Sequence, residues 1–286
     1  MLAAVLCSLV AVAASIPLEL SGSAIDQWKI DAEGCGKRNP PYTRDAEHYV
    51  VGGSEASPYT YPFICALYYG TSQICGGSLI RNLAGNYWFV TAAHCVDSGA
   101  VAQYSIRCGV HDLRATSQPF EFKPAIQARI IHESYSSSTI KNDIALFRLS
   151  QTGFPRERIS AVCIPTQDYR EGENSTVLGW GTLREGGSSS SLLQVASKPV
   201  VSDTTCRTAY GSSFDANSMV CAGVYPTGGI DACQGDSGGP LVAERNGELQ
   251  LIGIVSWGYG CARPYYPGVY SDVLRLKTWL NSKINA

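Results

Sequence analysis

The chain has 286 residues, of which 45% are hydrophobic and 16% are charged, and its formal net charge is -2. This composition supplies enough apolar material for a substantial core and too little charge for a disordered chain. The near-neutral charge predicts no basic surface, which argues against nucleic acid and anionic membranes as partners. The 29 glycines indicate many tight turns and favour an all-β chain.

The chain begins with an apolar stretch from Leu2 to Ala14, and its first charged residue is Glu19. A bilayer span needs about 20 apolar residues, so this stretch is too short to cross a membrane comfortably. Small residues at its end offer cleavage sites of the kind that follow secretory signals. We therefore predict a signal peptide over residues 1–15 and a secreted, extracellular protein. A buried N-terminal helix is the alternative, and the cysteine count argues against it.

Residues 16–49 are polar, contain Pro40 and Pro41, and show no sustained periodicity, which predicts a propeptide or linker. Over residues 50–286, short apolar runs recur between turn signals, and their length and β-branched content are typical of strands. The predicted strands include Phe63–Tyr69, Trp88–Thr91, Ile144–Leu149, Val177–Trp180 and Leu249–Trp257.

The one clear helix signal closes the chain. Ser271 or Asp272 is the expected N-cap. Apolar residues follow at helical spacing, namely Val273, Leu276, Leu280 and Ile284.

Cysteine is frequent in this chain. There are 11 cysteines, and Cys7 lies in the predicted signal peptide. The others form an even set, which in a secreted chain indicates a disulfide framework. Zinc is the alternative, but the sequence contains no C-x-x-C pair and no Cys/His ligand spacing.

A histidine, an aspartate and a serine stand in three short segments that fit one catalytic chemistry. They are His94 in TAAHC, Asp143 in NDIAL and Ser237 in GDSGGP. A serine hydroxyl is a poor nucleophile until a base takes its proton, and histidine ionises near working pH. A buried carboxylate can fix the imidazole tautomer. Singly these residues are typical of a turn or a packed core, but together they predict nucleophilic catalysis by serine.

With these segments, residues 50–286 resemble a whole protease domain of the chymotrypsin/trypsin family. The match follows the chain in order and also includes VVGG from Val50, CGGSLI from Cys75, GWG around Trp180, SWG from Ser256 and PGVY from Pro267. The resemblance implies an all-β fold of two packed six-stranded antiparallel β-barrels with a C-terminal α-helix. The site would lie in the cleft between the barrels.

The resemblance also implies a role for each site residue. Ser237 would attack the scissile carbonyl of a protein or peptide substrate, and His94 would take its proton and return it to the leaving amine. Asp143 would orient His94. The backbone N–H groups of Gly235 and Ser237 would form the oxyanion hole, where glycine leaves room for the substrate. No cofactor is required.

Specificity would come from Asp231, which matches the aspartate at the floor of the trypsin pocket. A carboxylate buried in an apolar slot is costly without a cation, so the resemblance implies cleavage after Arg or Lys. Ala232 stands where many trypsins carry a serine, which favours Arg over Lys. A solvated loop aspartate is the alternative. The implied substrate-binding set is Asp231, Ala232, Ser256, Trp257, Gly258 and Gly268.

Members of the family are made as zymogens and are activated by cleavage just before the segment that here begins at Val50. The new ammonium group would pair with Asp236 and order the oxyanion loop. Tyr49, not Arg or Lys, precedes Val50, so a protease that cuts after basic residues should not activate this chain. Cleavage at Arg44 would leave Asp45–Tyr49 attached. A protease that accepts tyrosine and a two-step activation both stay open.

The resemblance also implies a disulfide pattern. Cys35–Cys163 would keep a cleaved propeptide attached, and one further bond of the family is absent because Ser175 and Ala243 occupy its two positions. Cys65 and Cys108 are left over, and we pair them as an unusual fifth bond. The other implied pairs are Cys75–Cys95, Cys206–Cys221 and Cys233–Cys261.

Other ligands and modifications receive less support. The loop that binds calcium in many trypsins here holds Val110 and residues 117–119 in place of carboxylates, so no metal is expected. Asn174 begins an N-x-[ST] sequon and is a candidate glycosylation site. We expect a monomer that meets an activating protease and protein protease inhibitors.

A catalytically inactive homologue that serves as a binding or decoy module is the competing class of function. The presence of His94, Asp143 and Ser237 argues against it. Digestive and limited regulatory proteolysis are harder to separate. No accessory-domain motif is visible, which favours digestion.

Overall fold

The computed structural model describes residues 34–42, 49–50, 53–154 and 156–286, without the side chains of residues 49 and 50. The predicted signal peptide and most of the predicted propeptide lie outside these residues. Within the described part of the chain, no helix is long and apolar enough to cross a membrane.

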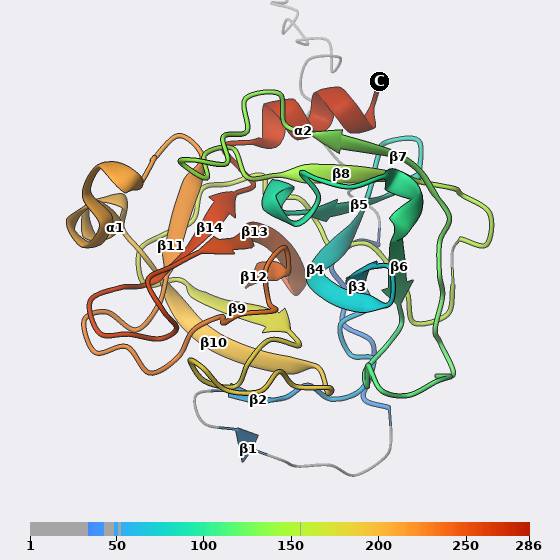
Figure 1. Cartoon of the computed structure of the whole chain (residues 1–286), viewed down its shortest axis with the longest axis horizontal. Coiled ribbons are helices and arrows are strands. Elements are labelled where there is room, and N and C mark those ends of the chain that lie inside the picture. The colour runs from blue at the N-terminus through green and yellow to red at the C-terminus, as the bar shows by residue number, and fades with distance from the viewer. Residues whose placement is uncertain (1–33, 43–48, 51–52, 155) are drawn as a thin grey trace, which may run out of the picture.

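The first half of the protease region forms a six-stranded antiparallel sheet with the strand order β6-β3-β4-β5-β8-β7. Its strands are rich in aromatic and β-branched residues, which favour extended chain. They are coloured cyan to green in Figure 1. Their bounds are β3 Ile64–Tyr69, β4 Ser72–Arg81, β5 Tyr87–Thr91, β6 Tyr104–Cys108, β7 Ile126–Ile131 and β8 Ala145–Leu149.

The second half forms a closed barrel, because β9 pairs with β10 and so joins the two ends of the order β10-β11-β14-β13-β12-β9. Two short strands, β1 and β2, extend this sheet beside β10. Figure 1 shows these strands mainly in yellow to red. Their bounds are β1 Tyr49–Val50, β2 Gly53–Glu55, β9 Asn174–Gly179, β10 Gln194–Val201, β11 Met219–Ala222, β12 Pro240–Arg245, β13 Glu248–Trp257 and β14 Gly268–Asp272.

Both predicted barrels are thus present, and the second is closed whereas the first is not. In the first sheet, the described residues contain no ladder between the edge strands β6 and β7, so this barrel is open on one side. The main apolar core contains residues of both sheets, including Phe89 of β5 and Leu251 of β13. Burial of this shared core packs the sheets against each other and fixes the loops between them.

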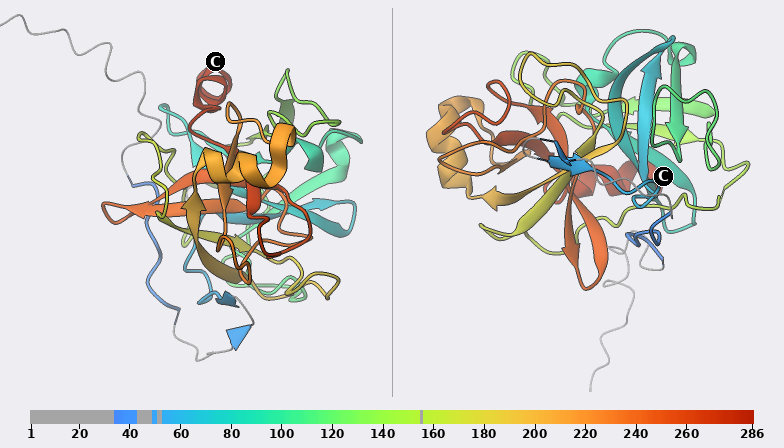
Figure 2. Two further views of the ribbon diagram at one scale, coloured as in Figure 1. Left: turned by 90° about the vertical axis from the view of Figure 1, so that its left-hand side faces the viewer. Right: turned by 90° about the horizontal axis from the view of Figure 1, so that it is seen from below.

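In the described part of the chain, two short α-helices accompany the sheets, and both differ from the expectation. The C-terminal helix α2 spans Lys277–Ile284 and has no side-chain cap. The predicted cap was wrong, because Ser271 and Asp272 end strand β14. Asp272 Oδ1 instead accepts the Arg275 N–H at 3.0 Å and stabilises the turn before the helix. Figure 2 shows α2 at the outside of the molecule.

Helix α1, Asp203–Tyr210, follows β10 and was not predicted. Its N-cap is Ser202, whose hydroxyl oxygen accepts the Thr205 N–H at 3.3 Å. The described residues also form the short 3-10 helices η2 Ala93–Cys95, η3 Val101–Gln103 and η4 Gly211–Ser213.

Among the described residues, five disulfides join distant parts of the chain, and they are the five pairs expected. Cys35–Cys163 ties the segment of residues 34–42 to the body of the protein. There Gly36 N donates to Ala161 O and Gly36 O accepts from Leu249 N, each at 2.8 Å. The other pairs are Cys65–Cys108, Cys75–Cys95, Cys206–Cys221 and Cys233–Cys261.

Candidate active site

The first pair of site residues is positioned by two neighbouring strands. His94 lies in η2, directly after β5, and Asp143 precedes β8. Strands β5 and β8 pair with Thr91 opposite Ala145, so the two segments leave the sheet side by side. His94 Nδ1 lies 2.8 Å from Asp143 Oδ2, and the backbone N–H of His94 donates to Oδ1 at 2.8 Å. The carboxylate therefore holds the ring with Nε2, which lies 3.7 Å from the disulfide sulfur of Cys95, as the nitrogen that can act as a base.

Asp143 itself is buried, with a relative exposure of 1%. Two hydroxyl groups of the second sheet reach across to it. Ser256 Oγ donates to Asp143 Oδ2 at 2.5 Å, and Ser271 Oγ donates to the backbone oxygen of Asp143 at 2.6 Å. A buried carboxylate needs donors such as Ser256 Oγ, and together the two hydroxyl groups hold the two halves of the site against each other. The sequence placed Ser256 in the substrate pocket but gave no sign of these two bonds.

The surroundings of His94 set its basicity. Burial lowers the pKa of the His94 imidazole, but the hydrogen bond and the charge of Asp143 outweigh this effect, so the pKa is raised above its ordinary 6.5. The direction is the one that a carboxylate partner produces. A base with this pKa takes a proton readily near neutral pH.

Ser237 lies in a tight turn just before β12. Gly235 has a φ of +95°, which L side chains rarely adopt, and the Ser237 carbonyl accepts the Gly76 N–H at 2.8 Å. Gly76 adjoins Cys75, whose disulfide partner Cys95 follows His94. Covalent and backbone links thus connect the serine turn with the histidine segment. Among the described residues, no hydrogen bond joins the Ser237 hydroxyl to another group.

Two backbone donors beside the serine are available. Within the described part of the chain, neither Gly235 N–H nor Ser237 N–H has a hydrogen-bond acceptor. Free N–H groups next to a nucleophile can stabilise a developing oxyanion.

A cavity of about 220 Å³ opens beside Ser237. Its walls include every residue of the predicted substrate-binding set, Asp231, Ala232, Ser256, Trp257, Gly258 and Gly268. A Cβ at Gly268 would lie 3.1 Å from Asp231 Cγ. A larger residue at position 268 would collide with the Asp231 carboxylate, and glycine avoids this collision.

Comparison with known proteins matches this geometry to one family. The family model described as Trypsin matches residues 50–280. The chain belongs to the trypsin family. It is 39% identical to Trypsin-1 of Astacus astacus over 240 residues, which cover 82% of this chain and 99% of the relative. It is 38% identical to Trypsin of Sus scrofa, covering 86% of this chain and all of the relative. The protein is accordingly a serine endopeptidase, a hydrolase that acts on protein substrates.

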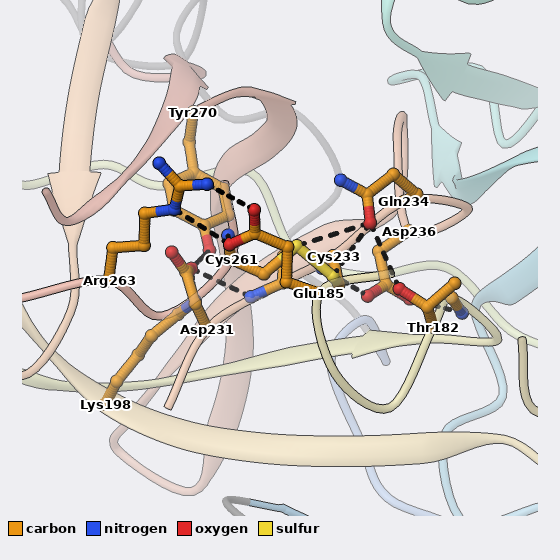
Figure 3. The surroundings of a disulfide bond; sticks show 12 residues. Thr182, Glu185, Lys198, Asp231, Cys233, Gln234, Asp236, Cys261, Arg263 and Tyr270 are labelled. Atoms are coloured by element: carbon orange, nitrogen blue, oxygen red, sulfur yellow. Dashed lines mark hydrogen bonds and ion pairs between the residues drawn. A yellow bond between two sulfur atoms is a disulfide. The ribbon is translucent and has the colours of Figure 1, made fainter. Parts of the chain in front are cut away.

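One feature at the floor of the pocket was not anticipated from the sequence or the trypsin-family resemblance. Lys198 of β10 forms an ion pair with Asp231 Oδ1, and the side chains of the two residues have relative exposures of 0% and 6%. Figure 3 shows the Lys198 side chain running from the strand to Asp231, close to the Cys233–Cys261 disulfide. A signal existed in the sequence, because Lys198 alternates with Ala196 and Val200 along a strand. Such alternation places the lysine on their side of the sheet.

A second cavity, of about 170 Å³, lies behind the serine turn. Gly53 of β2 and Asp236 both line it. Asp236 accepts the N–H groups of Gly181 at 2.8 Å and Cys233 at 2.9 Å. Burial raises the pKa of Asp236 to about 6, and these backbone bonds offset the effect only in part. A Cβ at Gly181 would lie 2.6 Å from Asp236 Cγ, so glycine is needed to admit the carboxylate.

Two groups of side chains have the donor spacing of a metal site, within the described residues. One is Cys75, His94 and Cys95, and the other is Cys35, Cys163 and Glu248. All four cysteines are bonded in disulfides, and metals bind the free thiolate. These groups therefore do not fit a metal ion.

Proposed function

We propose that Ser237 is the nucleophile of this endopeptidase, with His94 as its general base and Asp143 as the orienting carboxylate. The observation that carries the proposal is the bond of Asp143 to both His94 Nδ1 and His94 N–H, each at 2.8 Å. This arrangement presents His94 Nε2 as a base. Ser237 lies in the wall of the adjoining cavity.

The steps follow from these positions. Ser237 Oγ attacks the scissile carbonyl carbon while its proton moves to His94 Nε2, and Asp143 stabilises the resulting imidazolium. Gly235 N–H and Ser237 N–H donate to the oxyanion. The proton then passes from His94 to the leaving amine, and water hydrolyses the acyl-enzyme by the same route.

The protein is a zymogen in this proposal, activated by cleavage before Val50, either by an activating protease that accepts tyrosine or in two steps that begin at Arg44. The new ammonium group enters the cavity behind the serine turn and pairs with Asp236. Two observations support this route. Gly53, three residues after Val50, lines that cavity, and Figures 1 and 2 show β1 at the periphery of the molecule.

The remaining parts of the proposal concern the setting of the enzyme. Residues 50–286 form the protease domain, secreted to the extracellular space and open to protein inhibitors, with digestion as its role and limited regulatory proteolysis as the alternative. Asn174 begins β9 and is exposed, as a glycan acceptor must be. Cleavage after Arg or Lys stays a prediction from Asp231, and the ion pair of Lys198 with this carboxylate favours a different preference.

The test is the turnover of casein by the enzyme cut before Val50. Ser237→Ala should abolish turnover and leave the urea-unfolding midpoint unchanged, because the Ser237 hydroxyl has no hydrogen bond to the described residues. Ser137→Ala, an exposed serine of the first half, is the matched control and should retain full activity. Near-normal turnover by Ser237→Ala would refute the assignment.

A further inference from the structure

Lys198 is the only charged residue of strand β10. Alternate residues of a strand face the same side, so Lys198 shares its face with Val200, which belongs to the apolar core of the second barrel, and with Ala196, which packs against that core. Its side chain has a relative exposure of 0%. The aliphatic stem therefore runs through the barrel interior, and the ammonium group has no access to bulk water.

The neighbouring strands leave space for this side chain. Lys198 lies opposite Ser175 of β9, and Ser175 lies opposite Ala243 of β12. Directly paired residues point to the same face of a sheet, so two small side chains flank the lysine. They occupy the two positions at which the family carries a further disulfide. The departure from the family pattern and the buried lysine thus occur at one place.

The ammonium group of Lys198 is directed at the pocket floor. Besides its ion pair with Asp231 Oδ1, Nζ lies 5.1 Å from the centre of the Tyr270 ring. The same Oδ1 also accepts the Ala232 N–H at 2.8 Å and the Tyr270 hydroxyl at 3.3 Å. Asp231 Oδ2 has no donor among the described residues. Figure 3 shows Lys198 and Tyr270 meeting Asp231 from different sides.

We propose that Lys198 determines specificity by neutralising Asp231, so that the pocket accepts large uncharged side chains, tyrosine above all, before the scissile bond. The inference rests on the proposed function of Ser237 and His94 and concerns the substrate class of that same site.

The positive charge of Lys198 disfavours the binding of a basic substrate side chain beside Asp231. It would place a second cation beside Asp231 while Lys198 remains buried in place. Like charges that share one carboxylate in a water-poor site repel strongly. Lys198 cannot move to solvent, because its stem is enclosed by the core and an unpaired buried charge is costly. The carboxylate therefore offers a substrate Arg or Lys little of the attraction that an unpaired aspartate would.

A tyrosine side chain meets no such conflict. The walls of the cavity include Val255 and Trp257, and glycine at positions 258 and 268 keeps the slot free of side chains. Apolar walls favour an aromatic ring. The phenolic hydroxyl can donate to Asp231 Oδ2, which lacks a donor within the described part of the chain. Phenylalanine and leucine fit the same walls without this hydrogen bond.

The sequence contains a candidate substrate for such a pocket. Tyr49 precedes Val50, so the bond whose cleavage activates the zymogen follows a tyrosine. A pocket that requires Arg or Lys would leave this bond uncut, whereas the neutralised pocket accepts it. The inference therefore predicts self-activation, in which traces of active enzyme cut further precursor.

The experiment compares active enzymes that differ in Lys198. Residues 45–49 are replaced by the recognition sequence of enteropeptidase, so that every variant is cut before Val50 by one external protease. Lys198→Met removes the charge and keeps the length and apolar character of the stem. Lys123→Met is the matched control, because Lys123 is an exposed lysine with a side-chain exposure of 63% and a carboxylate partner, Glu121.

The readout is kcat/KM on peptides that differ only in the residue before the scissile bond, which is Tyr, Leu, Arg or Lys. The wild-type enzyme should prefer Tyr over Arg. Lys198→Met should raise the ratio of Arg to Tyr cleavage by at least about tenfold, because a charge-assisted hydrogen bond to Asp231 becomes available to the substrate. Lys123→Met should leave the ratio unchanged. Lys198→Ala gives a second test if the methionine variant does not fold.

Two results would overturn the inference. The first is a wild-type enzyme that prefers Arg or Lys before the scissile bond. The second is a folded Lys198 variant in which the ratio of Arg to Tyr cleavage equals that of the wild-type enzyme. Failure of the proposed function gives a different result, because a small neutral fluorophosphonate reacts with the nucleophile without using the pocket. An enzyme that reacts with this reagent but cleaves after Arg contradicts only the inference. An enzyme that neither reacts nor cleaves any peptide contradicts the proposed function.

Discussion

Cleavage before Val50 should stabilise the folded protein at neutral pH and have little effect on its stability in mild acid. The reason lies in Asp236, which is buried beside the activation cavity. Burial raises its pKa to about 6 in the uncut chain. After cleavage the ammonium group of Val50 reaches this carboxylate and favours its charged form, so the pKa falls.

The size of the effect follows from the pKa. The ordinary value is 3.8, and a rise to about 6 corresponds to a loss of about 3 kcal/mol of stability in the precursor at neutral pH. The folded precursor holds this proton more tightly than the unfolded chain does. The contribution of this proton to the free energy of unfolding is therefore fully present below pH 3.8 and is lost as the pH rises through about 6. The cut form does not lose this stability, because the ammonium group of Val50 keeps the pKa of Asp236 low.

The assay is urea unfolding of both forms between about pH 4 and about pH 7, followed by tryptophan fluorescence. Both forms carry Ser237→Ala, which prevents self-digestion. The disulfide Cys35–Cys163 keeps the released segment attached, so the two forms differ by one hydrolysed bond. The free energy of unfolding of the cut form should exceed that of the uncut form by an amount that grows from near zero to about 3 kcal/mol over this pH range. Asp236→Asn, which does not titrate, should remove the growth. A gap that stays constant with pH would refute the reasoning.

Two further predictions concern the disulfide frame and the catalytic base. Cys65 and Cys108 are 43 residues apart, so replacing both with alanine should lower the free energy of unfolding by about 4 kcal/mol, mainly through the unfolded chain; a loss below about 1 kcal/mol would contradict this. Because burial lowers the pKa of His94 less than Asp143 raises it, kcat/KM should rise with pH and level off above a pKa higher than 6.5. Asp143→Asn should shift this pKa down, and an unchanged pH profile would contradict the assignment.

The sequence was informative where function constrains short segments. His94, Asp143 and Ser237 each stand in a distinctive run of residues, and the resemblance to the trypsin family supplied the pocket set around Asp231. The main apolar runs were placed correctly, and they correspond to β3, β5, β8, β9 and β13. The length and β-branched content of these runs were sufficient to predict strands, because β-branched side chains pack well on the buried face of a sheet.

The helices were predicted less well for a physical reason. Helix α1 is only eight residues long, and its sequence DTTCRTAY contains three threonines, which are poor helix formers. Tertiary contacts and the Ser202 cap stabilise it instead. The start of α2 was misplaced because Ser271 and Asp272 are good caps in isolation, whereas their register with β11 and β13 holds them in a strand.

Lys198 shows what sequence reasoning left out. The alternation of Lys198 with Ala196 and Val200 indicates on which face of the strand it lies, but not its partner Asp231, which is 33 residues away. Only the closed barrel brings the two together. The net charge at Asp231 thus depends on two residues, and the sequence pointed to the negative charge of Asp231 but not to the positive charge of Lys198 beside it.

The most direct test of the account is the mapping of a fluorophosphonate adduct on the enzyme cut before Val50. Digestion and mass spectrometry should find one phosphonylated residue, Ser237, and His94→Ala should slow its formation strongly while the urea-unfolding transition is retained. An adduct on another residue, or labelling of Ser237 at the same rate without His94, would contradict the assignment of nucleophile and base.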